Sequence, residues 1–314
     1  MLIILFTINI VAPIFLLIIL GIFLKRIGLV NDVFVAQTSK FVFKVSLPAL
    51  IFLKIATVKI SEAFDGTLIL TSLSLVLIAA AISWIVSSFL TKSPADKGVL
   101  IQGSFRSNFA IIGLALIVNL IGESQLGKAS LVLAFVMPLY NVLAVIALTV
   151  PFKSERKYNY FETTKEIIKN PLILSALIAA PFSIFRIELG QVFTTTLSYL
   201  AKISLPLALI SIGASLNLRN LKRASKLSFA AMFNKIILFP TIAVFTGIYL
   251  NFDANQLAII YVLFASPTAI ASFIMADAMG SNSKLASDII VITTLFSIFT
   301  LSIGIVLLKY FALI

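Results

Sequence analysis

The chain has 314 residues, of which 61% are hydrophobic and 11% are charged, and its mean hydropathy is +1.14. This composition is too apolar for a soluble globular protein and predicts a protein embedded in a membrane. The absence of cysteine excludes disulfides and thiolate metal sites, and the absence of histidine removes the usual general base. We therefore predict no metal site, no cofactor and no enzymatic activity.

Ten apolar stretches are long enough to cross about 30 Å of hydrocarbon as helices. The first one lacks a basic leading segment and a small-residue cleavage site, so we expect a retained helix and not a signal peptide. The predicted spans cover residues 5–24, 37–56, 67–90, 98–121, 129–151, 171–187, 196–216, 227–250, 256–277 and 286–310.

Positive charge predicts how these spans are oriented. The 24 Lys and Arg residues outnumber the 12 Asp and Glu residues, and most of them lie in short gaps between apolar stretches, which suits lipid headgroups better than nucleic acid. With the N-terminus outside, the cytoplasmic gaps hold Lys25, Arg26, Lys40, Lys92, Lys97, Lys153, Arg156, Lys157, Lys165, Lys169, Arg219, Lys222, Arg223, Lys226 and Lys284. The opposite gaps hold Lys54, Lys59, Lys128, Arg186 and Lys309. We therefore predict a multi-pass protein of the plasma membrane with both termini outside.

The longest polar stretch divides the chain into two halves of five spans each. Residues 152–170 carry charges of both signs, which predicts a solvated cytoplasmic linker. Residues 1–151 and 171–314 are then the two five-helix units of a single membrane domain.

A pentapeptide near the start of each half indicates an internal repeat. Lys44–Pro48 has the sequence KVSLP, and Lys202–Pro206, 158 positions later, has the sequence KISLP. Two further pairs keep the order and almost the same offset: Pro13 with Pro171, and Ser107–Ile111 with Ser266–Ile270. Because five spans separate the equivalent segments, the two copies enter the membrane from opposite sides. We also expect the prolines of the pentapeptides, Pro48 and Pro206, to break their helices.

The fourth and ninth predicted spans contain residues that disfavour a continuous helix. Ser107 and Asn108 compete for backbone partners, and Pro267 removes a backbone donor. Irregular backbone inside a membrane requires cover from protein or a water-filled cavity, and the N-termini of broken half-helices suit a carboxylate. We predict a substrate site here that also includes Ser266 and Thr268. The alternatives are an interhelical hydrogen bond for Asn108, a simple kink at Pro267 and ordinary interhelical contacts for the hydroxyl groups.

Cations inside the predicted spans indicate an anionic substrate. Arg106 adjoins the predicted break, and Lys202 is a further candidate for substrate binding. A lysine costs about 2.5–3.5 kcal/mol at the centre of a membrane helix, so Lys44, Lys202 and Lys235 must reach an interface, find a partner or line a wet cavity. Snorkelling to the headgroups is the alternative for the lysines.

Few polar partners accompany these cations. Asn141 in the fifth span is a candidate substrate contact, with an interhelical hydrogen bond as the alternative. Asp277 is a candidate for proton transfer or for a charge pair with Lys44 or Lys235, although an interfacial position also fits. Asp277 and Asp288 do not form the central aspartate pair that an intramembrane protease needs.

The motifs closely resemble those of the auxin efflux carrier family, and the resemblance covers nearly the whole chain. It rests on residues 13–16 (PIFL), 41–43 (FVF), 47–50 (LPAL), 106–109 (RSNF) with Gly113, 170–173 (NPLI) and 206–216 (PLALISIGASL). The resemblance implies ten helices in two inverted five-helix repeats, in which helices 4 and 9 are broken and cross at the substrate site. Gly113 matches a helix-break position, but this chain has Ala115 where many relatives have proline, so the first break is expected to be less sharp.

The resemblance also implies the kind of cargo and the cellular location. Family members carry organic anions, such as auxin in plants and malate or malonate in bacteria. We expect a bacterial member in the inner membrane, an alternating-access mechanism and a homodimer. A passive anion channel or an ion-independent uniporter is the alternative function, and a receptor that binds the anion without moving it is another. Acidic residues are scarce in the predicted spans, so the sequence gives no basis for assigning a coupling ion.

Overall fold

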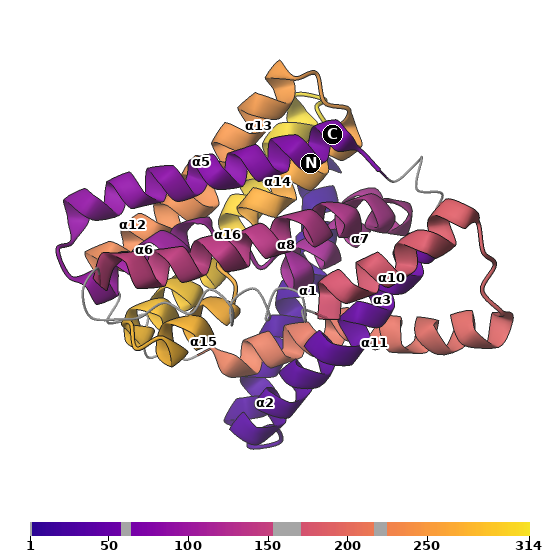
Figure 1. Ribbon diagram of the computed structural model, residues 1–314, viewed down its shortest axis with the longest axis horizontal. Helices are drawn as coiled ribbons and strands as arrows, with labels where there is room; N and C mark the ends of the chain where they lie inside the picture. Colours follow the sequence, from indigo (N-terminus) through magenta and orange to yellow (C-terminus); the bar gives the residue numbers. More distant parts are fainter. Residues whose placement is uncertain (1, 58–63, 153–170, 217–224) are drawn as a thin grey trace.

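The computed structural model describes residues 2–57, 64–152, 171–216 and 225–314, and Figure 1 shows that these residues form helices. No β-strand occurs among them, so the prediction of an all-helical protein is confirmed. The predicted linker at 152–170 lies outside the described residues, apart from Phe152.

The first half of the chain contains seven α-helices within its described residues. They are α1 (Leu2–Arg26), α2 (Asp32–Phe41), α3 (Leu47–Ala56), α5 (Gly66–Leu90), α6 (Pro94–Phe105), α7 (Leu114–Ile121) and α8 (Leu126–Thr149). Short turns of π-helix occupy Val42–Ser46 and Phe109–Gly113, and 3₁₀ turns occupy Glu123–Gln125 and Val150–Phe152.

The described residues of the second half also contain seven α-helices. They are α10 (Pro171–Phe185), α11 (Gln191–Ser215), α12 (Lys226–Phe233), α13 (Phe239–Tyr249), α14 (Ala254–Ala265), α15 (Ala271–Ala278) and α16 (Ser283–Tyr310). A π-helical turn, Asn234–Leu238, joins α12 to α13.

Six helical segments in the described part of the chain are long and apolar enough to cross a membrane. They are Ile3–Arg26, Gly66–Leu90, Glu123–Phe152, Gln191–Ser215, Lys226–Tyr249 and Ser283–Tyr310. Each coincides with a predicted span. The other four predicted spans correspond to shorter pieces: α2 with α3, α6 with α7, α10 alone, and α14 with α15. The protein is therefore a multi-pass membrane protein by length and composition.

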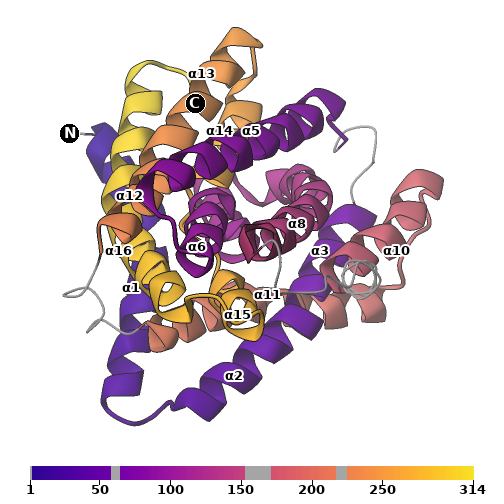
Figure 2. The same ribbon diagram turned by 60° about the vertical axis from the view of Figure 1, so that its left-hand side comes forward.

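The helices pack as two groups that contact each other. One group contains α1, α2, α3, α10 and α11, and the other contains α5, α6, α8 and α12 to α16, while α7 contacts both. Figure 2 shows α3 beside α10 in the first group, and α5 near α8 and α6 in the second. Within the first group, α1 and α11 approach closely because two glycines leave room for backbone. A Cβ atom at Gly213 would lie 1.8 Å from the Ile18 carbonyl oxygen, and one at Gly21 would lie 2.1 Å from that of Ile210. Small residues permit such backbone approach in membrane proteins.

The prolines of the repeated pentapeptide do not interrupt their helices in the described structure. Pro206 lies inside α11, which continues from Gln191 to Ser215. Pro48 lies in the first turn of α3, directly after the π-helical turn Val42–Ser46. At Pro48 the wider π-helical turn accommodates a residue without a backbone donor, whereas at Pro206 the α-helix itself continues through the proline. This corrects the expectation that Pro48 and Pro206 are helix breaks.

Polar residues of the loops cap the helices and connect them to one another. Asp65, the N-cap of α5, accepts hydrogen bonds from the Leu68 amide at 2.9 Å and the Gln256 side chain at 2.7 Å, and it pairs with Lys128 at 3.4 Å. Burial alone raises the pKa of the Asp65 carboxyl, but these partners together hold it below its ordinary value. Asp65 therefore joins the starts of α5, α8 and α14 as an ionised carboxylate.

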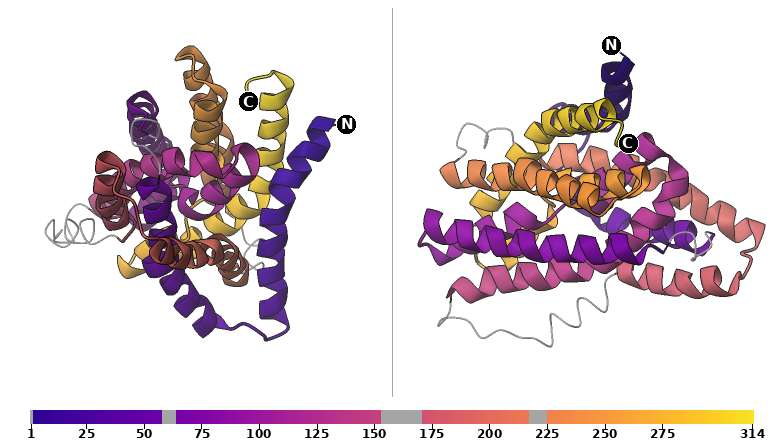
Figure 3. Two further views of the ribbon diagram at one scale, coloured as in Figure 1. Left: turned by 90° about the vertical axis from the view of Figure 1, so that its right-hand side faces the viewer. Right: turned by 90° about the horizontal axis from the view of Figure 1, so that it is seen from above.

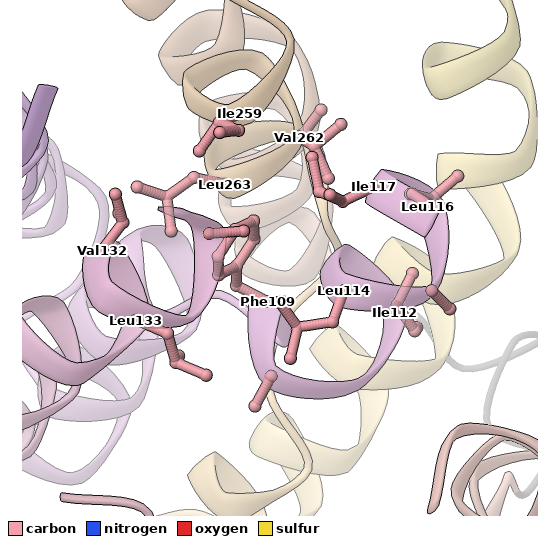
Figure 4. Close-up of a cluster of buried hydrophobic side chains, with 14 of the residues drawn as sticks. Phe109, Ile112, Leu114, Leu116, Ile117, Val132, Leu133, Ile259, Val262 and Leu263 are labelled. Atoms are coloured by element: carbon pink, nitrogen blue, oxygen red, sulfur yellow. The ribbon is translucent and has the colours of Figure 1, made fainter. Parts of the chain in front are cut away.

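The hydrophobic core surrounds the π-helical turn Phe109–Gly113, which leads into α7. Figure 4 shows the Phe109 ring between Val132 and Leu133 of α8 and Leu263 of α14. Phe109 is fully buried. Gly113 leaves space for this ring, because a Cβ atom at Gly113 would lie 2.3 Å from Phe109 Cδ2. Gly113 ends a π-helical turn and leads directly into α7, so its contribution here is space for packing and not a helix break.

Candidate functional site

Two irregular segments interrupt helices in the middle of the second group. The first lies between α6, which ends at Phe105, and the helical turn that begins at Phe109. The second lies between α14, which ends at Ala265, and α15, which begins at Ala271. We call them break 1 (residues 106–108) and break 2 (residues 266–270). They contain the Ser, Asn and Pro residues that the sequence marks as poor helix formers.

The two breaks pair with each other as short extended segments. Ser107 and Thr268 form an isolated antiparallel bridge. The Asn108 amide donates to the Pro267 carbonyl at 2.8 Å, and the Ala269 amide donates to the Arg106 carbonyl at 3.4 Å. Each break therefore supplies backbone partners that the other loses when its helix ends, which satisfies polar groups in the protein interior.

Side chains complete the pairing at break 2. The Thr268 hydroxyl donates to the Gly103 carbonyl of α6 at 2.6 Å, and its amide donates to the Thr293 hydroxyl of α16 at 3.2 Å. The Ser266 hydroxyl turns back to the Val262 carbonyl at 2.7 Å. Ser266 and Thr268 are fully or almost fully buried, so in this conformation they bind protein groups.

Arg106 directs its guanidinium toward neutral side chains. Nη2 donates to Asn141 Oδ1 at 2.7 Å, and Nη1 contacts Met275 Sδ at 2.6 Å. Its side chain is largely buried, with 6% of the residue exposed. A guanidinium has five N–H donors in a planar fork, so this arrangement leaves charge and donors for an anion.

A cavity of about 690 Å³, the Arg106 cavity, lies against both breaks. Arg106, Ser107, Asn108 and Asn141 line it, so four predicted site residues share one space. Residues close to the C-terminal end of each break also line it: Ala110 and Ile111 after break 1, and Ile270 and Ala271 at the end of break 2. Its volume falls in the range usual for small-molecule sites, and most of its lining is apolar with a few polar groups, as in such sites.

A second, smaller cavity of about 310 Å³ contains Lys202, and we call it the Lys202 cavity. Lys54 of α3 and Glu123 also line it, and they form an ion pair with 2.7 Å between Nζ and Oε2. The Lys202 cavity shares no lining residue with the Arg106 cavity. Lys202 is therefore not part of the space that holds Arg106 and Asn108.

The two cavities lie toward opposite ends of the same helices. Along α11, six residues between Ser198 and Leu209 line the Lys202 cavity, whereas Ala208, Ile212 and Ser215 line the Arg106 cavity. Along α2 and α3, residues up to Leu47 line the Arg106 cavity and those from Leu50 line the Lys202 cavity. The repeated pentapeptide thus places one lysine in each cavity: Lys44 in the Arg106 cavity and Lys202 in the other.

The remaining predicted residues lie elsewhere. Asp277 is exposed near the end of α15, away from the cluster at the breaks. Lys235 is fully buried, and its Nζ donates to the Phe264 carbonyl at 2.6 Å rather than to a carboxylate. Among the described residues, no group of three or more His, Cys, Asp or Glu residues is placed to hold a metal ion.

Several residues at the site were not predicted from the sequence. Met275, Tyr140 and Thr293 contact or line it, and the ion pair between Lys54 and Glu123 lines the Lys202 cavity. The sequence marks Lys54 as a loop charge, but it does not indicate that Lys54 pairs with Glu123, which lies 69 positions away. Met, Tyr and Thr inside apolar helices carry no distinguishing pattern, since each also occurs in ordinary packing.

Comparison with known proteins adds an independent finding. A family described as "Membrane transport protein" matches residues 6–165 and 159–305. A protein of Rhizobium meliloti named "Putative malonate transporter" is 24% identical over 300 residues, which cover 94% of this chain and 93% of that protein. An uncharacterised transporter of Methanocaldococcus jannaschii is 22% identical over 310 residues, covering 94% and 96% of the two chains. An uncharacterised transporter of Escherichia coli K12 is 22% identical over 300 residues, covering 92% and 94%.

Proposed function

The chain belongs to the membrane transport protein family of auxin efflux carriers, and on this basis we propose that it is a secondary carrier of small organic anions with its substrate site in the Arg106 cavity. Carboxylates such as malonate or malate are the proposed cargo, and the protein is a membrane transporter and not an enzyme. The observation that carries the proposal is Arg106, a cation at the paired breaks whose guanidinium has neutral partners and lines a cavity.

The chemistry of the Arg106 cavity favours a carboxylate. Arginine pairs with carboxylates through two parallel hydrogen bonds, and Asn108 and Ser107 supply further polar groups beside it. The chain resumes its helical course after both breaks at residues that line the same cavity, so amide groups at two helix starts add favourable potential for an anion. The name of the relative from Rhizobium meliloti agrees with this substrate class.

The two separate cavities support an alternating-access mechanism. A carrier needs one access path on each side of a central barrier, and the Arg106 and Lys202 cavities lie toward opposite ends of α11 without a shared lining residue. We propose that the described conformation is open further on the Arg106 side, and that movement between the two helix groups exchanges the larger and the smaller cavity.

The same arrangement supports the inverted repeat of two five-helix units. Equivalent lysines, Lys44 and Lys202, line cavities at opposite ends of the helices, as expected when two copies enter the membrane from opposite sides. The two ends of the described chain lie close together in Figure 3, which agrees with ten crossings and both termini outside. With that orientation the Arg106 cavity faces the cytoplasm, in a bacterial inner membrane.

Reconstituted vesicles test the proposed site. Wild-type protein in proteoliposomes is expected to take up labelled malonate with saturable kinetics. Asn108→Ala and Pro267→Ala are each expected to lower the rate at least about tenfold, because they alter the paired breaks. Lys309→Ala is the control, since Lys309 lies at the end of α16 over the Phe6 ring, at 4.8 Å from its centroid. Unchanged saturable uptake in both break variants means that the site has been placed wrongly.

The paired lysines give a test of the two access paths. Lys44→Ala is expected to raise the KM for malonate supplied on the Arg106 side, and Lys202→Ala to raise it on the other side. Vesicles of known orientation measure both sides, so each variant serves as the control of the other. Equal effects of either variant on both sides contradict the assignment of one lysine to each path.

Saturation also separates a carrier from a passive anion channel. A channel gives uptake that rises without saturation as malonate increases, whereas a carrier saturates. Uptake that saturates without any ion gradient identifies a uniporter, which is the other alternative. The homodimer remains a prediction, and the mass of the detergent-solubilised protein measures it.

A further inference from the structure

Lys235 occupies an unusual position for a charged side chain. It lies in the π-helical turn between α12 and α13 and has 0% of its surface exposed. A buried ammonium group in a membrane protein is costly unless polar groups replace its water. Lys235 meets this need through a carbonyl: its Nζ donates to the Phe264 oxygen at 2.6 Å.

Phe264 needs this partner because α14 ends directly after it. In a continuous helix the Phe264 carbonyl would accept from the amide of Thr268, but that amide donates to the Thr293 hydroxyl at 3.2 Å. Pro267 offers no amide to the carbonyl four residues before it. The C-terminal end of a half-helix also carries partial negative charge. Break 2 therefore creates a site that attracts a cation.

Inorganic cations are the usual occupants of such sites in secondary transporters. Unwound carbonyls and the C-terminal ends of half-helices coordinate sodium ions or accept protons at the midplane. Here the ammonium group of Lys235 reaches the end of α14 from a neighbouring helix and is covalently fixed to the protein. A tethered cation provides the same charge without any ion from solution.

We propose that Lys235 is a built-in cation for the broken end of α14, and that it replaces a mobile sodium ion in stabilising break 2. This inference rests on the proposed function only where it concerns transport: it makes the carrier independent of sodium. Its structural part concerns stability and is measured without any substrate.

The first experiment compares thermal midpoints of purified protein in sodium chloride and in choline chloride at equal ionic strength. The wild-type midpoint is expected to be the same in both salts. Lys235→Met, which keeps the length but removes charge and donors, is expected to lower the midpoint by about 5–10 °C in choline. Sodium or methylammonium is expected to restore part of that loss, since either can enter the vacated space near the Phe264 carbonyl.

Lys44→Met is the matched control. Lys44 also lies in a π-helical turn, Val42–Ser46, but it is exposed in the Arg106 cavity. Its replacement is expected to leave the midpoint unchanged in both salts. Lys235→Gln separates charge from hydrogen bonding, because an amide still donates: a midpoint between those of Lys235→Met and the wild type supports the fixed charge.

Three results overturn the inference. They are a wild-type midpoint that rises specifically with sodium, a Lys235→Met midpoint equal to that of the wild type, and a Lys235→Gln midpoint equal to that of the wild type. If Lys235→Met does not fold, the wild-type sodium titration and Lys235→Gln decide the question. In vesicles, wild-type malonate uptake is expected to be equal in sodium and choline. Absence of uptake in every salt counts against the proposed function and leaves the thermal result standing.

Discussion

Break 1 and break 2 pair with each other, yet the protein stabilises them in different ways. Break 1 contains its own cation, Arg106, whose side chain lies at a cavity between Asn141 and Met275. Break 2 has no charged residue, and Lys235 from a neighbouring helix satisfies the end of its half-helix. The end of α6 instead receives a neutral hydroxyl group, from Thr268.

This difference shows how exposure assigns different roles to similar charges. Arg106 lines a space that a ligand can enter, whereas Lys235 is sealed among helices with 0% exposure. The first cation is the proposed substrate contact, and the second donates to a carbonyl of the protein. Two breaks that pair with each other thus need not use their cations for the same purpose.

Replacing Arg106 should have the largest effect on transport. It removes the cation of break 1, and break 2 contains no charged residue that could take its place. Arg106→Ala is expected to lower kcat/KM for malonate uptake at least about 100-fold, since a charged hydrogen bond contributes about 1.5–3 kcal/mol and the carboxylate would lose two. Initial uptake rates in proteoliposomes measure this. Arg106→Lys is the control. It keeps the charge without the planar fork, and its kcat/KM should lie between those of Arg106→Ala and the wild type. Uptake at the wild-type level in Arg106→Ala excludes Arg106 as a substrate contact.

The bridge between the breaks allows a comparison of its two members. Thr268→Val is expected to destabilise the protein by about 1–3 kcal/mol, because the buried Gly103 carbonyl loses its donor at 2.6 Å. Ser107→Ala should have a smaller effect, since the Ser107 hydroxyl lies 3.5 Å from its acceptor, the Ser266 carbonyl. Thermal or denaturant unfolding in detergent measures both. Thr268→Ser keeps the hydroxyl group, so its free energy of unfolding should be close to that of the wild type. Equal losses for Thr268→Val and Ser107→Ala contradict the unequal stabilisation of the breaks.

The packing after break 1 gives a third test. Gly113→Ala is expected to cost about 1–3 kcal/mol, because the added methyl group would collide with the Phe109 ring. Adding Phe109→Leu should recover part of the loss, which a double-mutant cycle of unfolding free energies measures. Gly190→Ala is the control, since nothing lies within 4 Å of a Cβ atom there. Additive losses from the two substitutions would exclude this collision as the cause.

The smallest effect concerns the far end of α14, where Gln256 contacts Asp65 at 2.7 Å. The folded protein lowers the pKa of Asp65, so this carboxyl adds stability above its unfolded pKa and loses that contribution as pH falls through its folded pKa. Thermal midpoints measured from about pH 7 down to below the ordinary aspartate pKa of about 3.9 follow this loss. The thermal midpoint of Asp65→Asn should fall less than that of the wild type as the pH is lowered. An identical fall of the midpoint in both proteins would show that Asp65 does not contribute to this pH dependence.

Much of the architecture could be predicted from local sequence. Apolar length located the six long apolar helical segments, and Ser107, Asn108 and Pro267 marked the segments where α6 and α14 end. Both signals depend on short stretches of chain, whose preferences act before distant contacts form. The prolines of the pentapeptide show the limit of such signals, because the chain stays helical around Pro48, after a π-helical turn, and around Pro206, inside α11.

The surroundings of the lysines within apolar stretches could not be predicted. Lys44, Lys202 and Lys235 all present the same problem to a reader of the sequence, namely a cation within apolar residues. The structure gives them different surroundings: two cavities at opposite ends of the helices, and a carbonyl 29 positions away in the chain. Met275, which contacts Arg106 across 169 positions, likewise had no local signal.

The sequence by itself determined that this protein is helical, lies in a membrane, is rich in positive charge and has helices that end near Ser107 and Pro267. Those properties follow from composition and from the backbone preferences of single residues. Only the tertiary structure decided which cation faces a cavity and which one satisfies a broken helix. The reason is physical: solvent access and hydrogen-bond partners depend on how distant helices pack, and no short stretch of sequence contains that information.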